Sequence, residues 1–203
     1  MNPLEPVKLR EHLRPAVAGI IPLTLLTGCV FPLVLFALGR VLTPVQAAGS
    51  LVTRNGIVAG SRLIGQDFTR PEYFHARPSA AGTGYDGTSS GGTNLGPSNR
   101  KLIEDVRQLA RDYRKSNGLA PDATVPIDAV TRSGSGLDPH ISPQNAALQV
   151  PRVARARGLR EDAVRRLLAD HTEGRQLGFL GNARVSVLDL NLALDRAAPP
   201  APR

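Results

Sequence analysis

The chain has 203 residues, of which 41% are hydrophobic and only 4% are aromatic, with no Trp. This length accommodates one domain of ordinary size beside a membrane span. The single Cys excludes an internal disulfide. A net charge of +8 suits nucleic acid, anionic lipid or an acidic protein, and equally an Arg-rich proteome. Because the basic residues are spread along the chain, the pattern disfavours a nucleic-acid-binding protein.

An apolar run near the N-terminus is long enough to cross a bilayer. Residues 16–39 include no charged side chain, and Arg14 and Arg40 bound the run. As a helix the run would measure about 36 Å, against about 30 Å for the hydrocarbon core. Pro22 and Pro32 are tolerated in such a span, because neighbouring helices and Thr hydroxyls (Thr24 and Thr27) can bond the carbonyls that the prolines leave free.

Three alternatives compete with a membrane span. The run is too long for the apolar region of a cleaved signal peptide. Residues 26–29, Leu-Thr-Gly-Cys, resemble a lipid-attachment box, but the apolar run continues beyond Cys29. A buried core helix of this length would rarely lack a charge. We therefore predict a single transmembrane helix.

Flanking charges predict the orientation of this helix. Lys8, Arg10 and Arg14 precede it, whereas Arg40 and Arg54 follow it. The excess on the N-terminal side favours a cytoplasmic N-terminus. The predicted organisation is a cytoplasmic segment at 1–14, a transmembrane helix at 15–39, an extracytoplasmic domain at 40–196 and a flexible tail at 197–203.

The first half of the soluble domain combines a hairpin, a long loop and a helix. Asn55-Gly56 predicts a tight turn in a hairpin over 50–60. Residues 82–99 are rich in Gly, Ser, Thr and Asn and predict a loop. A helix is expected from Pro97-Ser98 to Asn117, with Gly118 as its stop. Its inward face is expected to consist of Leu102, Val106, Leu109 and Tyr113.

The second half adds further elements and predicts a mixed α+β fold. A short strand is expected over 125–130, followed by a polar turn over 131–143. Ser142-Pro143 predicts the start of a helix that reaches Gly158, bent or restarted near Pro151. A helix is expected over 160–171, with Val164, Leu167 and Leu168 facing inward. A buried strand is expected over 185–190, with an extension over 192–194.

The sequence offers one weak catalytic constellation. It contains no G-x-x-x-x-G-K-[ST] phosphate loop, and its four His residues are too far apart for a metal cluster. Ser135, Asp138 and His140 lie close together in sequence, but Gly-Ser-Gly at 134–136 is not a nucleophile elbow. The alternative is a rigid turn in which Asp138 and Ser142 bond backbone amides.

A Gly-rich segment at 89–99, Ser-Ser-Gly-Gly-Thr-Asn-Leu-Gly-Pro-Ser-Asn, leads into a helix N-terminus. Free amides and the helix dipole at such a point can bind an anion or a nucleotide. The favoured alternative is a tight loop that packs against a partner. The residues of the candidate anion loop are Ser90, Gly91, Gly92, Asn94 and Gly96.

Taken in order, the motifs of the chain resemble those of one family. They are QAAGSLV at 46–52, GSRLIGQDF at 60–68, YFHARPSA at 73–80, SSGGTNLGPSN at 89–99, VTRSGSGLDPHISP at 130–143, RVARARGL at 152–159 and VSVLDLNLALD at 185–195. Together with the apolar span, they closely resemble the C subunit of the Kdp potassium-transporting P-type ATPase of bacteria and archaea. Small departures are Cys29, Thr93 and Ser186, where the family more often has other residues.

The resemblance implies a non-catalytic subunit of a membrane complex that imports potassium at the expense of ATP. The implied partners are a channel-like, ion-selecting subunit and an ATP-hydrolysing subunit, and the complex uses ATP, magnesium and potassium. This chain lacks the Asp-Lys-Thr-Gly-Thr phosphorylation motif, and no cofactor or metal is expected to bind to it. The family is described as an assembly factor and as a chaperone that raises ATP affinity. The implied location is the bacterial or archaeal cell membrane.

The orientation, the alternatives and the partner contacts give further expectations. An outward-facing domain cannot meet cytoplasmic ATP, so an effect on ATP affinity would pass through the membrane helices. The alternatives to a pump subunit are an envelope enzyme that uses Ser135, Asp138 and His140, and an anchored binding module with a basic surface. Partner contacts are expected at Gly19, Gly28, Gly65, Gln66, Arg77, Pro78, Asn94, Asp138 and His140.

Overall fold

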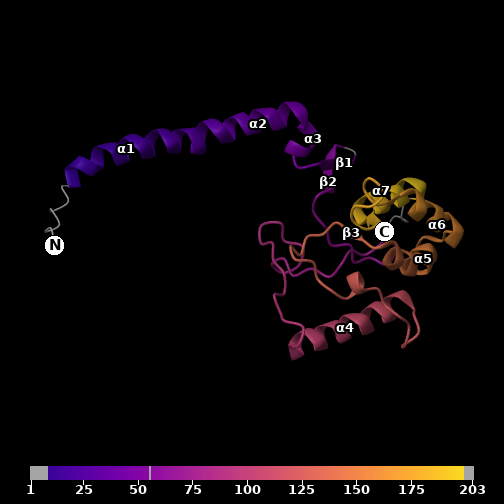
Figure 1. The fold of residues 1–203 in the computed structure, drawn as a ribbon. Coiled ribbons are helices and arrows are strands. Elements are labelled where there is room, and N and C mark those ends of the chain that lie inside the picture. The colour runs from indigo at the N-terminus through magenta and orange to yellow at the C-terminus, as the bar shows by residue number, and fades with distance from the viewer. Residues whose placement is uncertain (1–8, 55, 199–203) are drawn as a thin grey trace. The chain divides into compact units, whose positions relative to one another are not determined.

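A computed structural model describes residues 9–54 and 56–198 of the chain (Figure 1). The chain divides into two compact units, Met1–Ser50 and Leu51–Arg203. The first unit is helical, whereas the second contains both helices and short strands. The predicted combination of one long apolar helix with an α+β domain is thus confirmed.

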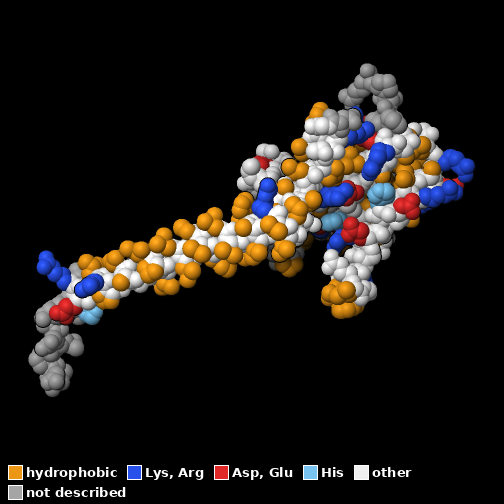
Figure 2. Space-filling model, turned by 90° about the horizontal axis from the view of Figure 1, so that it is seen from above, with side chains coloured by type: hydrophobic (Ala, Val, Ile, Leu, Met, Phe, Trp, Pro, Cys, Tyr) orange, Lys and Arg blue, Asp and Glu red, His pale blue; other side chains and the backbone are white. Residues whose placement is uncertain are grey.

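The first unit is dominated by one long helix. It consists of α1 (Leu9–Leu25), a single π-helical turn η1 (Leu26–Val30) and α2 (Phe31–Leu42), and a short helix α3 (Pro44–Ala47) follows. The 33 residues of Arg10–Leu42 have a mean hydropathy of 2.3 in their most apolar stretch, none of which is buried within the chain. Figure 2 shows hydrophobic side chains along this helix. Its length and composition make it a candidate membrane span.

The π-helical turn lies immediately before Pro32. The amide of Phe31 donates to the carbonyl of Leu26, five residues earlier. This wider turn is expected because a proline lacks an N–H and its ring crowds the carbonyl four residues before it. The Thr27 hydroxyl donates to Leu23 O at 2.7 Å. It therefore does not bond a carbonyl that either proline leaves free, which differs from the role predicted for it.

The second unit begins with the predicted hairpin. Strands β1 (Leu51–Arg54) and β2 (Ile57–Ser61) pair antiparallel, with an irregularity in register between Val52 and Thr53. Gly56 adopts a φ of +78°, as a tight turn requires. Asn55, the other residue of the predicted turn, lies outside the described residues.

A small antiparallel sheet forms the other β structure, in the strand order β3-β5-β4. Its members are β3 (His140–Ile141), β4 (Thr172–Glu173) and the central β5 (Arg184–Ser186). Ile141 and Thr172 both pair with Val185, which is completely buried. The sheet is short, so helices provide most of the core.

Four helices complete the domain, namely α4 (Arg100–Asn117), α5 (Pro143–Arg157), α6 (Glu161–Asp170) and α7 (Val187–Ala197). The hydrophobic core lies among α5, α6, α7 and the sheet. Its buried members are Phe74, Ile141, Ala146, Val150, Val153, Ala154, Val164, Leu168, Val185, Val187, Leu190 and Leu194. The predicted inward residues of α6 contribute to this core or pack against it. The predicted inward face of α4 is half-buried.

Local sequence signals place the helix ends correctly. The Asn99 side chain accepts from the Lys101 amide at 2.9 Å, so α4 begins slightly later than Pro97-Ser98. Gly118 and Gly158 end α4 and α5 with φ of +65° and +64°. Of the two predicted alternatives at Pro151, a bend or a restart, the restart does not occur, because α5 is continuous through this residue.

Two strand predictions are wrong. Residues 127–129 form a 3₁₀ turn, η2 (Ile127–Ala129), in place of a strand over 125–130. Pro126 begins this turn by accepting from the Ala129 amide at 3.1 Å. Of the strand predicted over 185–190, only 185 and 186 are in β5, because the Ser186 hydroxyl caps α7 by accepting from the Asp189 amide. The apolar run from 187 to 194 is therefore helical. In the predicted flexible tail, residues 199–203 lie outside the described residues.

Ser142 is expected to stabilise the domain by capping α5. Its hydroxyl accepts from the Asn145 amide at 3.1 Å and donates to Asp128 at 2.9 Å. Ser142→Ala should lower the free energy of unfolding by about 1–2 kcal/mol. The full-length chain in detergent can be unfolded with denaturant to measure this. The control is Ser89→Ala at an exposed position, which should change stability by less than about 0.5 kcal/mol. Equal effects of the two substitutions would contradict the assignment.

Candidate functional site

The motif-rich segment between Ser61 and Arg100 forms neither helix nor strand, yet parts of it are buried. Phe74 and Ala81 have no exposed surface at all. Backbone N–H and C=O groups that leave water need hydrogen-bond partners. Because no strand pairs with this segment, its partners must come from elsewhere.

Two amide side chains serve as these partners. Asn191 on α7 accepts from the Phe74 amide at 2.8 Å and donates to the Phe74 carbonyl at 2.9 Å. Gln149 on α5 accepts from the His75 amide at 2.7 Å and donates to the His75 carbonyl at 3.2 Å. Both side chains are 1% exposed. Each amide thus supplies a donor and an acceptor, as a neighbouring strand would.

Arg152 extends this arrangement. Its guanidinium donates to the carbonyls of Pro71 and Tyr73 at 2.6 and 2.9 Å, and to the side-chain oxygens of Asn117 and Gln149 at 2.9 and 2.7 Å. Burial lowers the pKa of Arg152 to about 10, which leaves it charged at neutral pH. We call the set Asn117, Gln149, Arg152 and Asn191, with the backbone that it bonds, the polar core network.

A second buried charge lies next to this network. Arg157 pairs with Asp195 at 2.8 Å, donates to Glu72 O at 2.6 Å and lies 4.9 Å over the Tyr73 ring. Arg54 of the hairpin pairs with the other carboxylate oxygen of Asp195. Burial would raise the pKa of Asp195, but hydrogen bonds from Arg157 and Arg54 lower it. Through Asp195, these ion pairs link the hairpin to α5 and α7.

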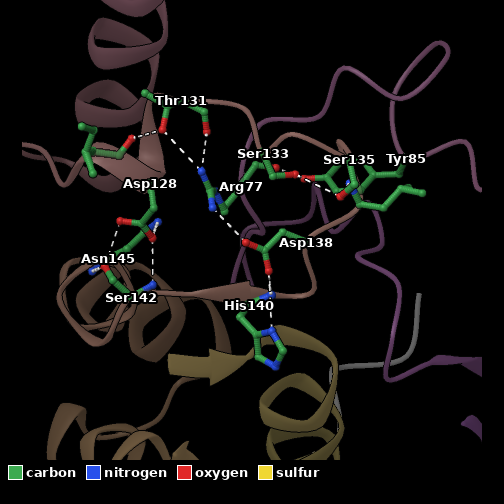
Figure 3. Close-up of polar contacts among 12 residues, drawn as sticks. Arg77, Tyr85, Asp128, Thr131, Ser133, Ser135, Asp138, His140, Ser142 and Asn145 are labelled. Atoms are coloured by element: carbon green, nitrogen blue, oxygen red, sulfur yellow. Dashed lines mark hydrogen bonds and ion pairs between the residues drawn. The ribbon is translucent and has the colours of Figure 1, made fainter. Parts of the chain in front are cut away.

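Arg77, Asp138 and His140 form a separate cluster on the domain (Figure 3). Arg77 pairs with Asp138 at 2.8 Å, and the His140 amide donates to the same carboxylate at 3.0 Å. Burial alone would raise the pKa of Asp138, but hydrogen bonds from His140 and Arg77 lower it to about 2. The Tyr85 hydroxyl donates to the carbonyl of Arg77. Three predicted partner-contact residues therefore contact one another.

The structure does not assemble a Ser–His–Asp triad. The Ser135 hydroxyl accepts from the Leu137 amide at 3.1 Å and lies 3.5 Å from the Ser133 hydroxyl. Among the residues that the structure describes, no hydrogen bond joins Ser135 to His140. Asp138 and Ser142 each accept from a backbone amide, as the rigid-turn alternative predicts. The geometry therefore favours a structural turn over an esterase-like site.

The Gly-rich loop packs closely against this turn. The Gly91 amide donates to Ser135 O at 2.9 Å, and the Ser90 hydroxyl donates to the same oxygen at 3.0 Å. A Cβ at Gly92 would lie 3.1 Å from Gly134 O, and one at Gly136 would lie 2.6 Å from the Ala81 amide. The glycines thus allow two backbone segments to touch.

Anion binding by this loop remains a prediction. The amide of Gly91 is already used within the domain. Asn94 has a φ of +51°, and a Cβ at Gly96 would meet no other atom within 4 Å. The Ser90 hydroxyl is engaged in the same way, and the five predicted residues remain candidates without a test.

Gly65 and Gln66 make packing and hydrogen-bond contacts within the domain. A Cβ at Gly65 would lie 2.6 Å from Asp138 O, so the close approach requires a glycine. With its amide oriented to satisfy both neighbours, Gln66 donates to Ala59 O at 3.1 Å and accepts from the Ser61 amide at 3.2 Å. Both residues thus join the motif segment to its surroundings.

The other predicted partner contacts lie elsewhere. Gly19 and Gly28 are in the first unit, Gly28 within the π-helical turn, and Pro78 is half-buried beside Arg77. A contact of any of the nine residues with another subunit remains a prediction. Sequence reasoning missed the polar core network. The sequence pattern that could have indicated this network is a polar residue within the apolar face of a helix, such as Asn191 between Leu190 and Leu194.

The fold and these clusters define a class: an α+β domain that follows a single candidate membrane span, and whose motif residues mostly hold the domain together. The chain matches the KdpC family, described as the K+-transporting ATPase c chain, over residues 13–196. It belongs to this family and is therefore a subunit of a potassium-transporting ATPase, which confirms the resemblance.

Curated relatives cover almost the whole chain. It is 50% identical to the potassium-transporting ATPase KdpC subunit of Koribacter versatilis, over 96% of this chain and 100% of the relative. It is 53% identical to the subunits of the same description from Mycobacterium bovis BCG and Cereibacter sphaeroides, over 93% of this chain and 100% and 99% of those proteins.

Asn191→Leu should test the polar core network. Leucine has a similar size but leaves the buried N–H and C=O of Phe74 without partners. We expect a loss of about 2–4 kcal/mol in the free energy of unfolding of the full-length chain. Asn182→Leu, at an exposed position, should change it by less than about 0.5 kcal/mol. Similar losses for the two variants would show that Asn191 does not have this role.

Asp138 should make stability depend on pH. Its pKa falls from 3.8 to about 2 on folding, so the unfolded chain binds more protons between these values. The stabilisation is complete above about pH 4, is lost as the pH falls towards 2, and amounts to at most about 2 kcal/mol. Unfolding at a series of pH values should show a shallower dependence for Asp138→Asn than for the wild type. An identical slope would rule out this role for Asp138.

Proposed function

We propose that this chain is the non-catalytic subunit of a high-affinity, ATP-driven potassium import complex. It stabilises the assembly of the ion-selecting subunit with the ATP-hydrolysing subunit, and its domain lies outside the cytoplasm. The observation that supports this most directly is that the family motifs bond one another inside the domain. Arg77 with Asp138, and Asn191 with Phe74, are examples. Such motifs suit a rigid body that docks onto partners.

The sequence adds support for a non-catalytic role. It contains no Asp-Lys-Thr-Gly-Thr phosphorylation motif, on which the ATP-hydrolysing subunit of such a pump depends. The Ser135 hydroxyl is engaged by the Leu137 amide within a turn. Of the basic residues behind the net charge of +8, Arg152 and Arg157 bond internal groups, which weakens the alternative of a basic binding surface.

The proposed orientation also limits any influence on ATP. Three basic residues precede the span (Lys8, Arg10 and Arg14) and two follow it (Arg40 and Arg54), which favours a cytoplasmic N-terminus. The domain would then lie on the side opposite to cytoplasmic ATP. An effect of this chain on ATP affinity would be a coupling transmitted through the membrane helices, without direct contact.

Assembly can be tested by expressing the other subunits of the pump with and without this chain. We expect an intact complex with potassium-stimulated ATP hydrolysis only when the chain is present. Subunits purified without it should separate on size-exclusion chromatography in detergent. A complex that stays assembled and active without the chain would contradict the proposal.

Orientation can be tested by a single exposed cysteine. Ser89→Cys in a Cys29→Ser background places one thiol on the exposed surface of the domain. A membrane-impermeant maleimide should label it in intact cells. Labelling only after lysis would place the domain in the cytoplasm and make the Gly-rich loop a nucleotide-site candidate. The Cys29→Ser chain alone is the matched control and should not be labelled.

A further inference from the structure

The loop between β4 and β5 displays large apolar side chains to solvent. Leu177, Phe179 and Leu180 are 83%, 69% and 47% exposed. They lie within six residues of sequence, Gln-Leu-Gly-Phe-Leu-Gly at 176–181. Scattered exposed apolar residues are normal on a domain, but a cluster of large ones marks an interaction site. We call these three side chains the apolar tip.

Hydrogen bonds define the shape of the loop. The amides of Gln176 and Leu180 each donate to the other's carbonyl at 2.9 Å. Leu177 has a φ of +52°, and Gly178 has a φ of +82°. A leucine in the left-handed region is unfavourable, because its Cβ crowds the backbone. Such strain persists where the surrounding structure imposes it, and it concentrates at functional sites.

Neither the strain nor the exposure benefits the domain by itself. All residues from 173 to 183 are exposed, so the tip contributes nothing to the core. An asparagine at 177 would suit both the backbone and water better. The combination is explained if the tip is covered in the assembled protein.

The charges around the tip favour a protein partner over lipid. Residues 176–183 carry no charge. Of the flanking cations, Arg184 pairs with Glu173 at 2.8 Å, which leaves Arg175. A loop that binds anionic lipid usually combines apolar residues with a cluster of cations. Protein interfaces instead favour aromatic and apolar anchors in a pocket, and this family consists of subunits of an ATPase.

We propose that Leu177, Phe179 and Leu180 insert into an apolar pocket of another subunit of the complex, on the side of the membrane where this domain lies. This inference rests on the proposed function and identifies the surface by which the domain docks. Phe179 is the central anchor, and the left-handed Leu177 presents its side chain next to it. Because hydrogen bonds already fix the conformation of the loop, little conformational entropy is lost when it docks.

The test compares two variants of the tip with one control in the full complex. Phe179→Ser removes the anchor, and Leu177→Asn replaces an apolar residue while relieving backbone strain. Ile127→Ser is the control, because Ile127 is 77% exposed and lies outside the loop. Each tagged chain is expressed with the other subunits, and the dilution at which it separates from them in detergent is measured.

We expect both tip variants to weaken association by roughly tenfold or more, and Ile127→Ser to match the wild type. Leu177→Asn should also melt at the same temperature as the wild-type full-length chain or higher, so that lost assembly cannot be attributed to misfolding. Association of Leu177→Asn and Phe179→Ser at wild-type strength would overturn the inference.

Two further outcomes have separate meanings. If the wild-type chain itself does not associate with the other subunits, the proposed function fails and not only this inference. If the tip variants assemble normally, while a fluorophore on Phe179→Cys in a Cys29→Ser background is quenched by spin-labelled lipid in proteoliposomes, the tip contacts lipid and the inference is wrong.

Discussion

The domain depends on one constraint: a buried stretch of chain without a β partner must have its backbone satisfied by side chains. Phe74 is fully buried, and its N–H and C=O both bond Asn191. Gln149 does the same for His75, and Arg152 bonds two further carbonyls nearby. Leaving such groups unpaired costs about 1–3 kcal/mol each, so the polar side chains cannot be replaced by apolar ones of equal size without loss.

The same constraint accounts for the specificity of the motifs. Residues 73–80 supply the backbone, whereas 152–159 and 185–195 supply or adjoin the side chains that bond it. A separate ion pair joins Arg77 to Asp138. The Gly-rich loop packs against the turn at 133–136 through the bonds of Ser90 and Gly91 to Ser135 O. These residues use their polar groups within the domain, which leaves loops on its surface to meet other subunits. This division of roles is consistent with the structural subunit that we propose.

Local features were predictable from the sequence, whereas the polar core network was not. The long apolar helix, the hairpin turn at Gly56 and the caps at Ser142 and Gly158 depend on neighbouring residues and are confirmed. The bond between Asn191 and Phe74 joins positions 117 residues apart, which no periodicity indicates. The strand expected over 185–190 is mostly helix, because its short apolar run suits both structures and the Ser186 cap decides between them.

If the polar core network has the role described above, its side chains hold residues 73–75 as rigidly as a sheet would. Hydrogen–deuterium exchange of the full-length chain in detergent tests it most directly. The amides of Phe74 and His75 should exchange as slowly as those in the middle of α5, such as Val150. Exchange as fast as in the exposed turn at 82–84 would show that the polar side chains do not protect this backbone, and would contradict the account.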